Sequence, residues 1–269
     1  MIQGAVLGSP INHSLSPILH SAAFEFLGIS GHYQAIEVKS GELKNFLHQN
    51  GESFDYFSLT MPLKEEVFSL DYTIDESAKG ALSGNTIFKR NGSFVVANTD
   101  SSGFLNALRN AGLGSISKVL VLGAGGTSRA VCAALNEVGV AIDVMGRTQS
   151  RSASLQAIVT RSDFRYLTWN DRISVEGYDL VVNTTPAGAA DLLSENIERV
   201  TSCALFDVIY RPWPTRLGRK WIDLNGVVIS GLELLLYQGL DQLSLVLNQS
   251  CQIPELISFC RTKLHAAAQ

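Results

Sequence analysis

Apolar residues recur along this chain in short blocks that alternate between two periods. Blocks with alternating or continuous apolar residues predict strands, and longer blocks with helical spacing predict helices. The predicted strands cover 3–8, 32–38, 54–59, 86–89, 94–97, 118–122, 140–145, 179–183, 204–208 and 227–229. The predicted helices cover 16–27, 41–49, 63–70, 100–111, 127–138, 232–248 and 254–267, with further helical stretches between the late strands. This alternation is typical of an α/β fold.

Several residues mark where these elements begin and end. Ser16 is expected to cap a helix in which Pro17 is the first helical residue, and Gly28 is expected to stop it. The Asn-Gly pair at 91–92 predicts a β-hairpin. Gly139 is expected to end the helix before the strand at 140–145. The strand at 118–122, this helix and the next strand form a predicted βαβ unit.

The length and composition limit the classes of protein to consider. A chain of 269 residues suggests about two domains at roughly 150 residues each, and we place a boundary near Asp100. With 46% hydrophobic residues, 17% charged residues and a net charge of −4, a folded protein without a nucleic-acid partner is expected. No apolar run reaches the roughly 18 residues of a membrane span, and the N-terminus has no basic segment typical of a signal peptide. The scattered cysteines indicate reduced thiols in a cytoplasmic protein, and the histidines lack metal-ligand spacing.

A glycine-rich turn follows the strand at 118–122. Gly123, Ala124, Gly125 and Gly126 stand where a strand passes into a helix. Such a turn brings the backbone close to a pyrophosphate at the helix N-terminus, although the sixth position of the dinucleotide fingerprint is Ser128 instead of glycine.

The end of the next strand indicates which dinucleotide is bound. Sites for NAD usually carry an acidic residue there, but this chain has Arg147, Thr148 and Arg151, while Asp143 lies inside the strand. Two guanidinium groups suit a 2′-phosphate, so the sequence favours NADP(H).

Short polar residues gather next to predicted turns in the first hundred residues. They are Ser14, Ser16, Thr60, Lys64, Asn85 and Asp100. A lysine at a helix start opposes the helix dipole, so Lys64 is either an ordinary surface charge or faces an anionic or carbonyl-bearing group. Hydroxyl, amide, ammonium and carboxylate groups together suit a small polyhydroxylated acid. Gln238 lies on an otherwise apolar helix and needs a polar partner if it is buried.

These motifs, in this order, closely resemble the shikimate dehydrogenase family over almost the whole chain. The matching segments are Ser14–Pro17, Ser58–Lys64, Leu82–Thr86, Asn98–Gly103, Gly123–Ala130, Gly146–Arg151, Asn183–Gly188, Asp207–Pro212 and Gly231–Gln238. The resemblance implies NADP-dependent, reversible reduction of 3-dehydroshikimate to shikimate on the route to chorismate and the aromatic amino acids. It further implies a monomer or a homodimer.

The resemblance also implies a domain plan and residue roles. A substrate-binding domain at 1–100, completed by helices at 236–269, accompanies a Rossmann-type NADP-binding domain at 101–235, with the active site between them. Lys64 and Asp100 are expected to form the catalytic pair. The expected substrate-binding residues are Ser14, Ser16, Thr60, Asn85, Tyr210 and Gln238. The expected cofactor-binding residues are Gly123, Ala124, Gly125, Gly126, Arg147, Thr148, Arg151, Thr185, Ile209 and Gly231, and no metal is expected.

Departures from the family pattern leave alternatives open. Ser58 and Gly146 replace asparagines, and Ala189 and Leu234 replace methionines. Gly146 is expected to loosen the adenosine end of the cofactor site. The alternatives are an NAD-dependent quinate/shikimate dehydrogenase, an amino-shikimate paralogue, a binding module without catalysis, and a methylene-tetrahydrofolate-type dehydrogenase.

Overall fold

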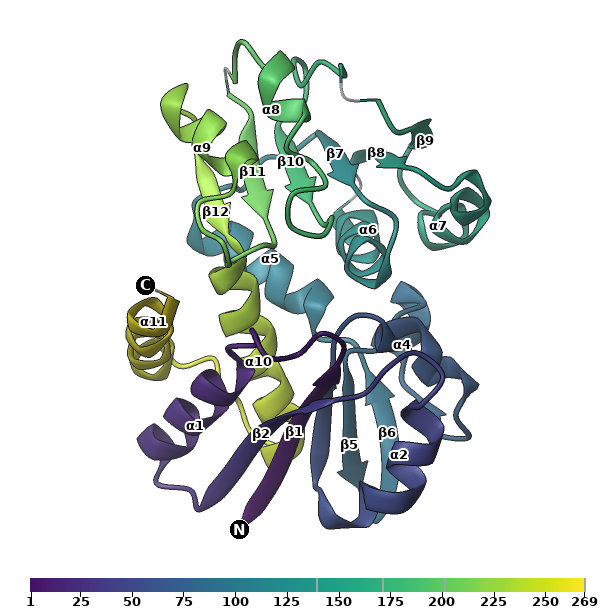
Figure 1. The fold of residues 1–269 in the computed structure, drawn as a ribbon, viewed down its shortest axis with the longest axis vertical. Coiled ribbons are helices and arrows are strands. Elements are labelled where there is room, and N and C mark those ends of the chain that lie inside the picture. The colour runs from purple at the N-terminus through teal and green to yellow at the C-terminus, as the bar shows by residue number, and fades with distance from the viewer. Residues whose placement is uncertain (139, 171, 201, 269) are drawn as a thin grey trace. The chain divides into compact units, whose positions relative to one another are not determined.

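Strands and helices alternate along the chain in the computed structural model, which describes residues 1–138, 140–170, 172–200 and 202–268 (Figure 1). The chain divides into two compact units. The first contains Met1–Gly103 and Leu235–Gln269, and the second contains Phe104–Leu234. The α/β class predicted from the sequence is confirmed. No described helix combines the length and the apolar character that a membrane crossing requires.

The first unit is built on a mixed sheet of six strands in the order β2-β1-β3-β5-β6-β4. Its strands are β1 (Ile2–Gly8), β2 (Gly31–Glu37), β3 (Tyr56–Leu59), β4 (Thr73–Ile74), β5 (Thr86–Arg90) and β6 (Ser93–Ala97). Its helices are α1 (Ser16–Leu27), α2 (Leu43–Asn50), α3 (Leu63–Glu66), α4 (Glu76–Ala81) and α11 (Pro254–Ala268), with short 3₁₀ turns at Gly51–Ser53 and Val67–Ser69. β1 pairs in parallel with β2 and β3, while β5 is antiparallel to both β3 and β6.

The alternation of side chains along the central strands divides this sheet into two faces. Leu7 of β1 and Phe57 of β3 point into an apolar core with Leu43 of α2. The residues next to Leu7 and Phe57 along each strand point to the other face, because successive side chains of a strand alternate in direction. Tyr56 and Ser58 therefore lie on that second face, where both are buried.

The second unit is built on six parallel strands in the order β12-β11-β10-β7-β8-β9. These are β7 (Lys118–Leu122), β8 (Ala141–Gly146), β9 (Phe164–Thr168), β10 (Leu180–Asn183), β11 (Ala204–Asp207) and β12 (Val228–Ser230). Its helices are α6 (Gly126–Val138), α7 (Ser152–Ile158), α8 (Leu193–Asn196) and α9 (Arg216–Asp223), and a 3₁₀ turn covers Gln149–Arg151. The strand order reverses between β7 and β10, which is where doubly wound sheets bind dinucleotides.

Two helices contain the points at which the chain passes from one unit to the other. These are α5 (Asp100–Asn110) and α10 (Gly231–Leu247). Most of α10 belongs to the first unit, whereas most of α5 belongs to the second. The substrate-binding and cofactor-binding roles expected for the two parts of the chain remain predictions.

The local signals were correct at some ends and wrong at others. Gly28 ends α1 in the left-handed conformation with φ 64°, and the hairpin turns at Asn91 and Gly92 with φ 53° and 79°. The predicted Ser16 cap is wrong, because Leu15 is the N-cap residue and Ser16 already lies in the helix. The hydroxyl of Ser14 instead accepts the Ser16 N–H at 3.3 Å. The predicted stop at Gly139 lies outside the described residues.

Candidate active site

Most of the predicted catalytic and substrate-binding residues lie at one edge of the first sheet. The parallel strands β1 and β3 both end there, and the antiparallel pairing places the start of β5 and the end of β6 at the same edge. Segments that follow or precede these strand ends therefore meet. They carry Ser14, Ser16, Thr60, Lys64, Asn85 and Asp100.

Lys64 and Asp100 form a close ion pair at this edge. Lys64 lies in the short helix α3 and Asp100 is the first residue of α5, and the Lys64 Nζ is 2.5 Å from the Asp100 Oδ2. The side chains are 15% and 5% exposed, so the pair is largely withdrawn from water. This carboxylate is the anionic group that the position of Lys64 predicted. A held ammonium of this kind can donate to, or exchange a proton with, a substrate oxygen.

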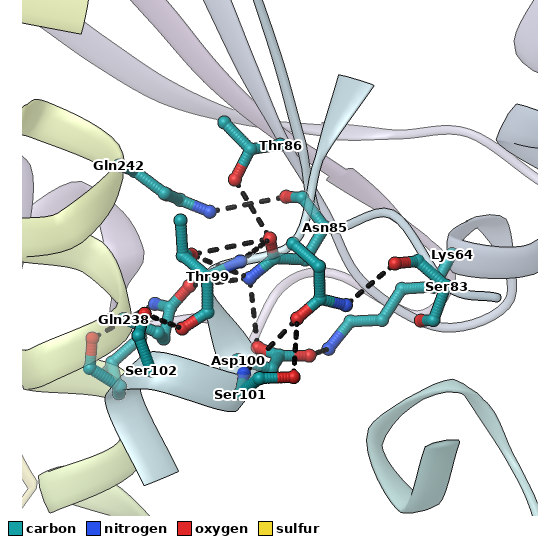
Figure 2. Close-up of polar contacts among 12 residues, drawn as sticks. Lys64, Ser83, Asn85, Thr86, Thr99, Asp100, Ser101, Ser102, Gln238 and Gln242 are labelled. Carbon is teal, nitrogen blue, oxygen red and sulfur yellow. Dashed lines mark hydrogen bonds and ion pairs between the residues drawn. The ribbon is translucent and has the colours of Figure 1, made fainter. Parts of the chain in front are cut away.

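Asn85 orients the carboxylate of this pair. Its Nδ2 donates to the Asp100 Oδ1 at 2.9 Å, so the two oxygens of Asp100 face different partners (Figure 2). The same Nδ2 lies 2.9 Å from the Thr99 Oγ1 and 3.1 Å from the Gln238 Oε1. The Asn85 Oδ1 accepts the Thr99 N–H at 2.8 Å and the Thr86 hydroxyl at 2.8 Å. Asn85 is only 1% exposed, and these bonds fix its side chain tightly.

Gln238 has the polar partners that its place on an apolar helix required. In addition to accepting from Asn85, its amide donates from Nε2 to the Leu235 carbonyl at 2.9 Å. The structure thus brings Lys64, Asn85, Asp100 and Gln238 into one connected group.

The other predicted substrate-binding residues are Ser14, Ser16, Thr60 and Tyr210. Ser14 and Thr60 are half-buried at the same sheet edge, and Ser16 is buried. The Thr60 backbone is fixed by its N–H bond to the Leu7 carbonyl at 2.9 Å. Tyr210 is half-buried and belongs to the second unit. Their contacts with a substrate stay predictions.

Sequence reasoning missed several residues that support this site. Asn98 accepts the Ser101 N–H through Oδ1 at 3.1 Å and donates to the Ser83 carbonyl at 2.7 Å, which fixes the start of α5. Gln242 lies one turn after Gln238 on α10 and is 1% exposed. The available signal was a second glutamine on the same apolar helix at a spacing of four residues.

The predicted cofactor residues lie at the carboxyl ends of the strands in the second sheet. Each group follows a different parallel strand, so all of them meet at one edge of that sheet. Gly123, Ala124, Gly125 and Gly126 follow β7; Arg147, Thr148 and Arg151 follow β8; and Thr185, Ile209 and Gly231 follow β10, β11 and β12.

The turn between β7 and α6 has the features that a bound pyrophosphate requires. Gly123 adopts φ 103°, and a Cβ there would lie 2.6 Å from the Thr184 Oγ1, so only glycine fits. A Cβ on Gly125 would meet no atom within 4 Å, so its backbone faces open space. Gly126 opens a helix of 13 residues, whose N-terminal N–H groups and dipole favour an anion.

The segment after β8 contains the two arginines, Arg147 and Arg151, that the sequence analysis predicted for a 2′-phosphate. Arg147 is exposed, while the Arg151 guanidinium donates to the Ala124 carbonyl at 3.2 Å, which joins this segment to the glycine turn. The Thr148 carbonyl accepts the Arg151 N–H at 3.1 Å and the Tyr166 hydroxyl at 2.8 Å. The donor set and the open glycine turn together fit a dinucleotide with a 2′-phosphate.

Gly146 has a packing reason that the sequence did not reveal. A Cβ at this position would collide with the Tyr166 hydroxyl, so the tyrosine occupies the space that the asparagine of the family motif would need. Because Tyr166 also binds the Thr148 carbonyl, it restrains the loop that Gly146 was expected to loosen. Burial raises the pKa of Tyr166.

Buried hydrogen bonds order the remaining loops at this edge. Asn183 donates to the Asp207 Oδ1 at 3.0 Å and accepts the Thr185 hydroxyl at 2.6 Å. The same Asp207 oxygen accepts the Ile209 N–H at 3.2 Å, and burial raises the pKa of this carboxyl.

Asp143 has hydrogen-bond partners inside the second unit. Its Oδ2 accepts the Tyr178 hydroxyl at 2.6 Å, and its Oδ1 accepts the Arg165 Nε–H at 2.8 Å.

Comparison with known proteins assigns the family. The family model "Shikimate dehydrogenase substrate binding domain" matches residues 6–87, and "Shikimate / quinate 5-dehydrogenase" matches residues 107–209. The shikimate dehydrogenase (NADP(+)) of Thermus thermophilus is 35% identical over 249 residues, which cover 89% of this chain and 90% of that protein. The chain belongs to the shikimate dehydrogenase family. The resemblance seen in the sequence motifs is thereby confirmed.

Other members of the family agree in sequence and in fold. The shikimate dehydrogenase (NADP(+)) of Bacillus cereus is 32% identical over 246 residues, covering 87% of this chain and 88% of the relative. The solved structure of a Thermus thermophilus shikimate 5-dehydrogenase in complex with NADP(H) and shikimate has a TM-score of 0.83 at 31% identity, covering 98% of this chain and 100% of its own. The complex with shikimate has a TM-score of 0.85 at 32% identity, covering 100% and 99%.

Proposed function

We propose that this chain catalyses the reversible, NADP-dependent reduction of 3-dehydroshikimate to shikimate in the biosynthesis of chorismate and the aromatic amino acids. The observation that carries the proposal is the Lys64–Asp100 pair, oriented by Asn85, in a chain whose relatives are named shikimate dehydrogenase (NADP(+)). We assign substrate binding and catalysis to residues 1–100 with 236–269, and cofactor binding to residues 101–235.

The chemistry requires a group that manages the proton of the C3 oxygen. Oxidation of the alcohol removes that proton, and reduction of the ketone returns it. Lys64 Nζ binds the C3 oxygen, and Asp100 holds the ammonium in place through the 2.5 Å ion pair. Asn85 keeps the carboxylate from turning, because it occupies the second oxygen. Such preorganised charge stabilises a developing alkoxide without rearrangement.

The other residues of this sheet edge bind the substrate. The hydroxyls of Ser14 and Ser16 bind the carboxylate, and Thr60, Asn85, Tyr210 and Gln238 bind the ring hydroxyls. These roles are supported by the gathering of all but Tyr210 in the first unit and by the polar, uncharged character of the side chains.

The second unit holds NADP(H), which when bound supplies the hydride acceptor or donor. The glycine turn and the start of α6 bind the pyrophosphate, Arg147 and Arg151 with Thr148 bind the 2′-phosphate, and Thr185, Ile209 and Gly231 line the nicotinamide side. A cytoplasmic location and a monomeric or homodimeric state belong to the same proposal. The location is supported by four free, buried cysteines.

Initial rates with shikimate and quinate, each crossed with NADP⁺ and NAD⁺, test the function. We expect turnover with shikimate and NADP⁺ and much slower rates in the other three combinations. Comparable rates with quinate or NAD⁺ would instead identify a broader quinate/shikimate dehydrogenase. The absence of turnover in all four would refute the proposed reaction.

A further inference from the structure

A series of buried hydrogen bonds runs behind Asn85 and joins three elements of the first unit. Tyr33 of β2 donates from its hydroxyl to the Ser58 Oγ of β3 at 2.5 Å. Ser58 in turn donates to the Gln242 Oε1 of α10 at 2.6 Å, and the Gln242 Nε2 donates to the Asn85 carbonyl at 3.2 Å. All four residues are buried, so water cannot easily replace a lost bond.

Helix α10 holds Asn85 at two points through neighbouring glutamines. Gln238 accepts from the Asn85 side chain at 3.1 Å, and Gln242, one turn later, binds the Asn85 main chain (Figure 2). The Asn85 carbonyl also accepts the Leu59 N–H at 2.7 Å. The backbone of Asn85 is therefore fixed between β3 and α10, and its side chain aims at Asp100 from this fixed base.

Ser58 explains how the amide of Gln242 reaches this position. Serine is shorter than the asparagine of the family motif, which leaves room for a side chain from another element. The Gln242 amide fills the room beside Ser58 and uses both of its polar atoms, one on Ser58 and one on Asn85.

We propose that Gln242 is a positioning residue of the active site, which fixes Asn85 and through it the Asp100–Lys64 pair. This inference rests on the proposed function, because it assigns Gln242 to the reaction of that pair. It adds a residue that acts through Asn85, the group that orients the Asp100 carboxylate.

The variant Gln242→Met tests the proposal, since methionine has a similar length and makes neither hydrogen bond. We expect kcat/KM for shikimate to fall about tenfold, the effect of losing one to two buried hydrogen bonds, while KM for NADP⁺ stays unchanged. Gln252→Met is the matched control. Gln252 also ties down α10, with bonds to the Tyr237 carbonyl at 3.0 Å and the Asp241 Oδ1 at 2.7 Å, but it does not bond to Asn85 or Ser58. The control should lower the melting temperature and leave kcat/KM unchanged.

A rescue and a structure separate positioning from general stability. Adding Ser58→Asn to Gln242→Ala returns an amide beside Asn85 and should recover most of the lost activity. In a crystal structure of Gln242→Met, the Asn85 Nδ2 to Asp100 Oδ1 distance should exceed the 2.9 Å of the native chain. An unchanged distance, or equal activity losses in Gln242→Met and Gln252→Met, would overturn the proposal. If the native chain does not turn over shikimate, the proposed function fails and the crystallographic distance alone decides on Gln242.

Discussion

Lys64 owes its place to partners that are distant in sequence. Asp100 binds it directly, and Asn85 occupies the other carboxylate oxygen, so the ammonium has a fixed direction. A lysine at a short helix start contributes little to folding, and an ion pair with 15% and 5% exposure has a modest net effect on stability. The presence of a lysine at this position is therefore better explained by the proposed catalytic role than by a contribution to stability.

Replacing Lys64 by methionine is expected to lower kcat by about 10²- to 10⁴-fold, the usual contribution of a positioned proton-transfer group. KM for shikimate should change far less, because Ser14, Ser16 and Thr60, the proposed substrate-binding residues, are intact in this variant. Steady-state rates with NADP⁺, with circular dichroism as the control for folding, provide the measurement. A preserved kcat with a raised KM would make Lys64 a binding residue only.

Arg147→Ala is expected to raise KM for NADP⁺ by about 10- to 100-fold, since a hydrogen bond to a charged group contributes about 1.5–3 kcal/mol. KM for NAD⁺, which has no 2′-phosphate, should be unaffected.

The variant Tyr166→Phe should raise KM for NADP⁺ severalfold, because it releases the Thr148 carbonyl that the Tyr166 hydroxyl holds at 2.8 Å. Equal effects on both cofactors would contradict the assignment of this loop to the phosphate.

At the scale of elements, the glycine turn between β7 and α6 separates a folding requirement from a binding requirement. Gly123 is confined by φ 103° and by Thr184, whereas Gly125 faces open space. Two glycines of the same motif thus have different physical reasons to be glycine.

The two positions should respond differently to alanine. Gly123→Ala is expected to cost about 1–3 kcal/mol of unfolding free energy, through a strained backbone and a close contact. Gly125→Ala should leave the unfolding free energy within about 0.5 kcal/mol, because its Cβ would meet no atom within 4 Å. It should raise KM for NADP⁺, because that Cβ would enter the open space that we propose for the pyrophosphate. Urea unfolding and cofactor titration measure the two effects, and a strongly destabilised Gly125→Ala would contradict this division.

Elements with strong local signals were predictable from the sequence, and those fixed by distant partners were not. Gly28 and the Asn-Gly pair at 91–92 act within a few residues of themselves, so their turns were correct. Strand β9 was missed because it lies at the sheet edge and is only partly buried, with an arginine at 165 that pairs with Asp143. Gln242 was missed because its partner Ser58 lies 184 positions away in the chain.

At the scale of the whole molecule, we expect stability in acid to depend on a histidine in the interior of the first unit. His20 is 0% exposed, stacks on Tyr33 with ring centroids 4.0 Å apart, and has its Nδ1 2.7 Å from the Tyr56 hydroxyl. Burial lowers the pKa of His20 to about 3, against 6.5 as the ordinary value. Between these two pH values, the imidazole is therefore neutral in the folded chain and protonated in the unfolded chain.

Between pH 6.5 and about pH 3, this histidine is expected to weaken the fold by about 1.4 kcal/mol for each unit that the pH falls. The unfolded state binds the extra proton in this window, so the contribution is complete above pH 6.5 and is lost on acidification. The variant His20→Asn, whose amide can still hydrogen-bond to the Tyr56 hydroxyl, should reduce this loss of unfolding free energy with falling pH. Urea unfolding of both proteins from pH 7 to pH 4.5 measures the difference, and parallel curves would disprove the role of His20.

The second unit is one continuous stretch, Phe104–Leu234, set within the first, whose last part returns only at Leu235. During synthesis on the ribosome, all residues of the second unit are thus present while the first unit still lacks most of α10 and all of α11. Lys64 and Asp100 emerge early, but Gln238 follows Asn85 by 153 positions. The connected group of Lys64, Asn85, Asp100 and Gln238 can therefore be completed only after the whole of the second unit has been synthesised, because Gln238 follows that unit in the chain.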